Sequence, residues 1–180
     1  MGGADKKEIA RVLQDGVDAL MDALRGVDEA TATLRPHPES WSVAECVEHI
    51  VLTETALLAR LKEAKPAGES RQDNAREARF QELAMNRLRR IDAPDLVTPR
   101  PGLRSLAEAS GCFERIRGET MRYVEEFEGD LRWWLTTHPL ITRPVNCYEM
   151  LLLIALHPKR HAQQIALIRE QLSRPRSQMK

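Results

Sequence analysis

The stretch LHPKRHAQQI, from Leu156 to Ile165, contains two histidines four residues apart. Residues i and i+4 of an α-helix lie on one face, so the imidazole rings of His157 and His161 would stand one above the other and could bind one metal ion. The same spacing also occurs in pairs of core histidines whose ring nitrogens are satisfied separately. The pair is therefore a candidate metal site that needs a third ligand from elsewhere in the chain.

His49 is the candidate for the third ligand. It lies in WSVAECVEHIVLTE, just beside the apolar face of a predicted helix, and could reach inward along a seam between helices. Three imidazoles leave coordination positions open for water or substrate, which is typical of catalytic rather than structural metal sites. The residue types predict a divalent metal ion (zinc, nickel, iron or manganese) without identifying it. His37 and His138 each precede a proline in a predicted loop and are weaker candidates.

Other side chains near these histidines offer polar groups. Glu54 falls on the apolar seam of the helix that carries His49, where a carboxylate must pair with an arginine, orient a ligand histidine or act as a base. Thr53 lies one turn from His49 on the same side. Gln164 lies on the inward face of the helix that carries the pair and could hold a bound water or a polar group of a substrate. Cys46 is expected to be a buried, inert cysteine.

Pro158 directly follows the first histidine of the pair. Its ring removes one backbone donor and crowds the carbonyl of Ile154, so we expect the helix to bend or bulge there. Such a distortion could turn His157 toward a metal ion or away from it.

Four positions carry the same helix-start pattern, a short polar residue followed three positions later by glutamate. Each precedes apolar residues at helical spacing that extend over about twenty residues or more. Amphipathic helices of this length bury their apolar faces against one another, which predicts an all-α fold, a four-helix bundle. The four pairs are Asp5 with Glu8, Ser42 with Glu45, Ser105 with Glu108, and Asn146 with Glu149.

The connections between these helices are long and contain proline, as in RPHPES, TPRPG and THPLITRP. Such connections permit a topology other than simple up-and-down. The charged segment from Ser70 to Arg90 is predicted to hold an additional short helix, anchored by Phe80, Leu83 and Leu88. No alternating, β-branched run predicts a strand.

The composition predicts one soluble domain spanning residues 1–180. Lys plus Arg and Asp plus Glu number 27 each, so no net positive charge attracts nucleic acid. No uncharged apolar run approaches the roughly 20 residues of a membrane-spanning helix, and residues 1–10 lack the apolar core of a signal peptide. Three widely spaced cysteines fit a reducing compartment, so we expect a cytoplasmic protein without nucleic-acid or membrane partners.

A second apolar row on the last predicted helix lies on the side opposite its histidines. It consists of Leu152, Leu156 and Leu167. A helix that is apolar on two sides is either central in its fold or packed against another molecule. The row therefore predicts a homodimer.

Two sequence blocks, WSVAECVEH and HPLITRPVNCYEMLLLIALHPKRHAQQI, resemble those of the DinB/YfiT-like superfamily. The segment from Ala93 to Ala109 resembles the loop before that family's third helix, and the likeness extends roughly from Pro38 to Leu172. In the family, the histidine of the first block and the H-x-x-x-H pair of the second bind a divalent metal inside a four-helix bundle. The resemblance implies that His49, His157 and His161 are the metal ligands. Family members often have a glycine after the HP element, where this chain reads HPLITRPVN, which implies a different pocket wall.

The resemblance also implies a metal-dependent enzyme that acts on a small-molecule substrate. Some relatives transfer low-molecular-weight thiols such as bacillithiol or mycothiol to small electrophiles, so thiol S-transfer is the first expectation and hydrolysis of a small substrate the second. The rival hypothesis is a non-catalytic, metal-binding or stress-related bundle that acts through interactions. A role in DNA repair, which the family name suggests, gains no support from the neutral net charge.

Overall fold

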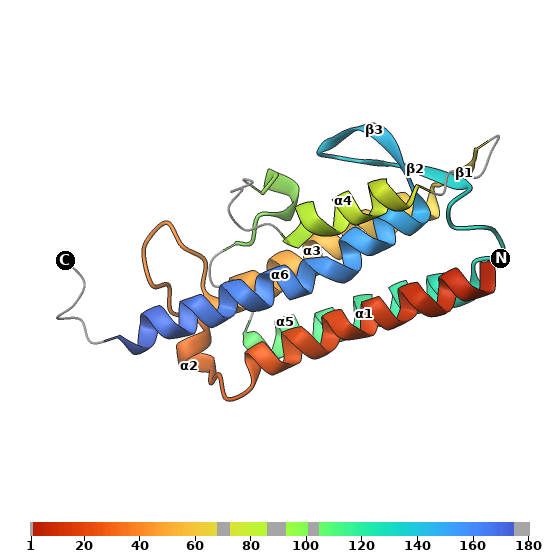
Figure 1. Ribbon diagram of the computed structural model, residues 1–180. Helices are drawn as coiled ribbons and strands as arrows, with labels where there is room; N and C mark the ends of the chain where they lie inside the picture. Colours follow the sequence, from red (N-terminus) through yellow and green to blue (C-terminus); the bar gives the residue numbers. More distant parts are fainter. Residues whose placement is uncertain (1, 68–72, 86–92, 101–104, 175–180) are drawn as a thin grey trace.

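The computed structural model describes residues 2–67, 73–85, 93–100 and 105–174 of the chain. Four long helices lie side by side and form a bundle (Figure 1). They are α1 (Gly2–Leu24), α3 (Val43–Lys62), α5 (Leu106–Glu126) and α6 (Cys147–Ser173). The four-helix bundle predicted from the apolar patterns is confirmed.

Three of the four predicted helix starts are capping boxes. The side chains of Ser42, Ser105 and Asn146 each accept a hydrogen bond from the backbone N–H three residues later, and the glutamate there accepts one in return. The predicted start at Asp5 is wrong, because α1 begins at Gly2. Asp5 instead lies in the first turn of α1, where the positive end of the helix dipole suits a carboxylate.

The helices do not follow a simple up-and-down order. α1 packs against α5 and α6, and α3 packs against the same two helices. Figure 1 shows α1 and α6 running in one direction and α3 and α5 in the other. Accordingly, Arg169 of α6 donates to the carbonyl of Ala23 at the end of α1, whereas Lys6 at the start of α1 donates to that of Glu125 at the end of α5. The chain between α3 and α5 must therefore return along the bundle.

The described part of that returning segment contains two short helical elements. They are α4 (Asn74–Met85) and the 3₁₀ helix η1 (Asp95–Val97). α4 falls within the predicted additional helix and packs on α6, with Phe80 buried in the core. The side chain of Leu83 and the whole of Leu88, the other two predicted anchors, lie outside the described residues.

A small antiparallel sheet of three strands lies at the end of the bundle where α3 ends and α6 begins (Figure 1). The sequence pattern predicts a proline-broken connection over part of this region and no strand, and that prediction is wrong. Pro139 lies in the turn of the hairpin, and Pro144 lies in an edge strand, where a missing N–H is tolerated. The strands are β1 (Lys65–Pro66), β2 (Trp134–His138) and β3 (Ile141–Asn146).

The apolar core consists of two clusters to which all four bundle helices contribute. One cluster includes Val145 of β3, and the other includes Ala32 of the short helix α2 (Glu29–Ala32), which connects α1 with α3. None of the helices in the described part of the chain combines the length and the apolar character needed to cross a membrane.

Two members of the second apolar row of α6 are buried within the chain itself. Leu152 is 1% exposed and shares a core cluster with Phe80 of α4, while Leu156 is 8% exposed. Leu167 is 48% exposed. Packing of α4 on α6 therefore accounts for much of the row without a second copy of the chain, and the homodimer stays a prediction.

Candidate metal centre

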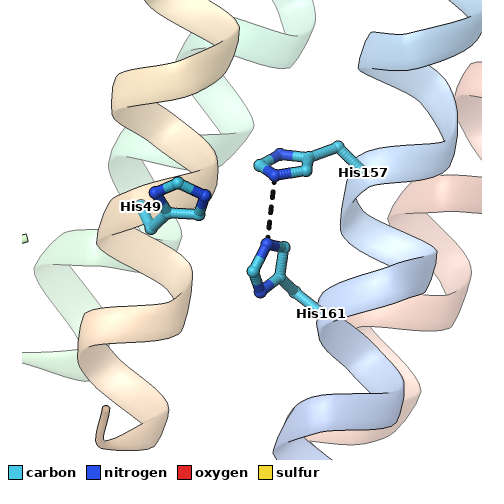
Figure 2. Close-up of side chains that lie close together, drawn as sticks. All are labelled: His49, His157 and His161. Atoms are coloured by element: carbon cyan, nitrogen blue, oxygen red, sulfur yellow. Dashed lines mark hydrogen bonds between the residues drawn. The ribbon is translucent and has the colours of Figure 1, made fainter. Parts of the chain in front are cut away.

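Three histidines from distant parts of the sequence converge between α3 and α6 (Figure 2). His49 comes from α3, and His157 and His161 come from successive turns of α6. One nitrogen of each ring lies within 4.8 Å of the corresponding nitrogens of the other two, and the Nε2 atoms of His157 and His161 are 3.0 Å apart. No other trio of potential metal-binding side chains is found within the described ranges.

Hydrogen bonds at Nδ1 orient two of these rings. His49 donates from Nδ1 to the carbonyl oxygen of Val97 in η1 at 2.7 Å, and His161 donates from Nδ1 to Oε1 of Gln164 at 3.0 Å. An imidazole that carries its proton on Nδ1 has a lone pair on Nε2. The two acceptors therefore select the tautomer in which Nε2 is available to a metal ion.

The separation of His157 and His161 fits two ligands of one divalent ion. Two nitrogens bound to one ion at about 2.1 Å, at angles between octahedral and tetrahedral, lie about 3.0 to 3.4 Å apart, and the His157–His161 separation falls in this range. Burial lowers the pKa of His49, and burial together with the neighbouring histidines lowers the pKa of His157 well below its ordinary value. Both shifts favour neutral imidazole, which is the form that binds metal.

Trp41 covers one side of the cluster. Its ring centroid lies 4.7 Å from that of His49 and 6.3 Å from that of His161, with the second pair stacked. Trp41 is the residue directly before Ser42, the N-cap of α3. The capping box that starts the helix therefore also fixes the position of the Trp41 ring beside the histidines. An apolar ring here keeps water away from one side of the imidazoles.

The DinB superfamily model matches residues 13–165, a span that includes all three histidines. The chain belongs to the DinB superfamily. The fold of this DinB-superfamily protein is similar to that of YfiT from Bacillus subtilis, described as a probable metal-dependent hydrolase with an unusual four-helix bundle topology. The two chains share 14% identity with a TM-score of 0.57, over 94% of this chain and 89% of that one. A comparison with curated proteins gave no match.

Pro158 does not interrupt α6 of the DinB-superfamily protein. Its ring leaves the carbonyl of Ile154 without a helical donor, and Arg117 of α5 donates to that oxygen from Nη2 at 3.3 Å. The same guanidinium donates from Nη1 to the carbonyl of Leu13 in α1 at 2.8 Å. Of the two orientations open to His157, the structure has the one in which the ring points toward the other histidines (Figure 2).

Glu54 has both carboxylate oxygens occupied. Arg117 donates to them from Nε at 2.9 Å and from Nη2 at 2.8 Å, and Thr120 donates from Oγ1 at 2.7 Å. Of the three roles open to Glu54, pairing with an arginine is confirmed. All three hydrogen bonds come from α5, so that helix and not a histidine holds the carboxylate.

Of the remaining candidate residues, Gln164 contacts the histidine cluster. Cys46 is fully buried in the core and is not part of the histidine cluster. His37 is exposed and His138 lies in β2, so neither joins the site. The role predicted for Gln164, binding a water or a substrate, is replaced by the hydrogen bond that it accepts from His161. Its position three residues after that histidine is the signal that could have indicated this contact.

Three contributors to the site were missed by sequence reasoning. Val97 accepts the hydrogen bond through its backbone carbonyl, which every residue has, so its residue type gave no signal. Arg117 belongs to a helix whose polar positions are mostly solvent-facing, so nothing in the sequence separates it from surface arginines. Trp41 stands directly before a helix cap, and that position could have marked it as part of the site.

Proposed function

We propose that this protein is a metal-dependent enzyme whose divalent ion is held by the Nε2 atoms of His49, His157 and His161. The observation that carries the proposal is the convergence of these rings while Val97 and Gln164 occupy the Nδ1 groups of two of them. An ion bound there would act as a Lewis acid that activates a water molecule or polarises a substrate.

The remaining side chains define what such a site favours. Three neutral imidazoles do not reduce the positive charge of a divalent ion, so the site favours an anionic or strongly polar small molecule. Trp41 keeps water from one side of the rings, and Val97 and Gln164 hold the ligand tautomers. Arg117 and Glu54 neutralise each other and add no net charge.

Hydrolysis of a small polar substrate is the reaction that we favour. YfiT, whose fold is similar, is described as a probable metal-dependent hydrolase. Thiol S-transfer, the other reaction of the family resemblance, would use the same Lewis acid with a thiol in place of water. Consumption of added thiol together with an electrophile, in preference to hydrolysis, would identify the protein as a transferase instead.

Elemental analysis tests the site directly. We expect purified wild-type protein to bind about one divalent ion per chain, and His49→Ala and His161→Ala to lose affinity by at least about tenfold. Added zinc, nickel, iron or manganese should raise the melting temperature of the wild type more than that of either variant, because only the folded site binds the ion. His138→Ala is the matched control, since His138 lies outside the site.

Two outcomes would contradict the proposal in different ways. A wild type that retains no metal, and whose melting temperature no divalent ion raises, would remove the metal site itself. Metal binding without any His49- or His161-dependent turnover, in a screen of hydrolysis and thiol-conjugation substrates, would support the non-catalytic bundle.

A further inference from the structure

Thr53 carries a buried hydroxyl oxygen that has no hydrogen-bond partner in the part of the chain that the structure describes. Among the described residues, Nε of Arg76 also lacks a hydrogen bond of good geometry, but it lies 2.6 Å from Oε1 of Glu149 in an ion pair, and Nη2 of the same guanidinium donates to Oε2 of that carboxylate. Burying an unpaired hydroxyl costs free energy, so a partner that is not part of the protein chain is the expected explanation.

Other threonines show the usual arrangement in a helix. Thr55 donates to the carbonyl of Val51 at 2.8 Å, four residues earlier in its helix. Thr120, whose proton is shared with the carboxylate of Glu54, lies 3.1 Å from the carbonyl oxygen of Ile116, again four residues earlier. Thr53 could bond the carbonyl of His49 in the same way, yet it does not. Its hydroxyl is therefore available to a group beyond its own helix.

The position of Thr53 indicates what that group is. Thr53 follows His49 by one turn of α3, so both side chains lie on the same side of the helix, where α3 packs on α6. Thr53 and His157 are partly exposed, whereas His49 and His161 are buried. The hydroxyl thus lies one helical turn from His49, on the side of α3 that carries the imidazole toward the other two histidines.

We propose that the Thr53 hydroxyl hydrogen-bonds the small molecule that completes the coordination of the ion. The inference rests on the proposed function, because it requires an ion at the three histidines. A hydroxyl next to a cation with neutral ligands best suits a small anion that accepts a hydrogen bond through oxygen or nitrogen, such as a carboxylate or azide. Thr53 is then a ligand-contacting residue that orients the bound molecule relative to the ion.

Azide binding to the Co²⁺-loaded protein tests this role, with visible absorption of the ion as the readout. Thr53→Val removes the hydroxyl at nearly constant shape, Thr53→Ser retains it, and Thr55→Val is the matched control in the same helix. We expect Thr53→Val to weaken azide binding by about tenfold, and Thr53→Ser and Thr55→Val to change it by less than about threefold. Co²⁺ affinity should stay within about threefold in all variants, because Thr53 is not a ligand of the ion.

The melting temperature of the metal-free protein supplies a second readout. An unpaired hydroxyl contributes nothing to the fold, so Thr53→Val should melt at the wild-type temperature or above it. A lower melting temperature would mean that the hydroxyl has a partner within the protein and would overturn the inference.

Unchanged azide affinity in Thr53→Val that binds Co²⁺ normally would also overturn it, while leaving the metal site intact. Failure of the wild type itself to bind Co²⁺ would instead refute the proposed function, and this inference with it.

Discussion

Arg117 is the residue at which the interior contacts of the bundle meet. It is 3% exposed, pairs with Glu54 through two nitrogens, and donates to the carbonyls of Leu13 and Ile154. A buried charge is tolerated only when such partners surround it. Because one partner is the carbonyl that Pro158 deprives of its donor, the guanidinium compensates for a defect in the helix that carries two of the site histidines.

Replacing Arg117 by methionine should lower the free energy of unfolding by about 3 to 5 kcal/mol, because the change leaves the carboxylate of Glu54 buried without a counter-charge. Urea denaturation followed by circular dichroism measures the loss. Adding Glu54→Met to the variant should recover much of the stability, since the uncompensated charge is then removed as well. An equal loss in the single and the double variant would show that the charge of Glu54 is not the cause.

At the scale of elements, α1 approaches α6 closely at one glycine. A methyl group on Gly16 would lie 2.4 Å from the carbonyl oxygen of Ala155, well inside van der Waals contact. Ala155 lies two residues before His157. The absence of a side chain at Gly16 therefore sets the distance between two helices next to the histidine cluster.

Gly16→Ala should lower the free energy of unfolding by about 1 to 3 kcal/mol, although alanine favours helices, because α1 must move away from α6. Gly118→Ala is the matched control, since a methyl group there meets nothing within 4 Å. It should raise stability by up to about 1 kcal/mol through helix propensity alone. Thermal denaturation of both variants measures the difference, and a stabilised Gly16→Ala protein would mean that the helices do not need this close approach.

The bundle helices were predictable because their signals are local. The caps at Ser42, Ser105 and Asn146 and the apolar spacing behind them depend on residues within a few turns of each other. The histidine pair of α6 is likewise a local pattern. His49 was a candidate from its place beside the apolar face of its helix, and the family resemblance implied the same ligand. All three rings converge as expected.

The parts that were not predictable depend on long-range contacts or on backbone groups. The hydrogen bond from His49 to Val97 joins residues 48 positions apart and ends on a carbonyl. The strands are short, and the two that contain a proline, β1 and β3, are the edges of the sheet, where a missing N–H is tolerated. The start at Asp5 failed because the helix-start pattern is equally compatible with a residue inside the first turn.

At the scale of the whole molecule, three partly or fully buried histidines make the stability of the metal-free protein depend on pH. Burial lowers the pKa of His49, His138 and His157 below their ordinary value of 6.5. Between the lowered values and 6.5, the unfolded chain binds more protons than the folded one. The neutral histidines therefore contribute their full stabilisation above pH 6.5, and this stabilisation is lost as the pH falls toward their lowered pKa values.

The free energy of unfolding of the metal-free protein should accordingly decrease between about pH 7.5 and pH 5.5, by up to about 1.4 kcal/mol per pH unit for each histidine that takes up a proton on unfolding. Urea denaturation in the presence of a chelator measures this slope. His157→Gln should flatten it, whereas the same change at the exposed His37 should not. A flat or rising stability toward acid would contradict the burial of neutral imidazoles.

The pairing of α1 with α6 has a consequence for how the molecule is made. The ion pair of Asp15 with Lys159 and the hydrogen bond from Arg169 to Ala23 join positions about 145 residues apart, so the first helix leaves the ribosome long before its main neighbour exists. Until α6 has been made, the apolar stripe of α1 lacks its main packing partner, and His49 cannot meet His157 and His161. Chains that stop before the last helix should therefore be bound by chaperones or degraded instead of accumulating as a partly active protein.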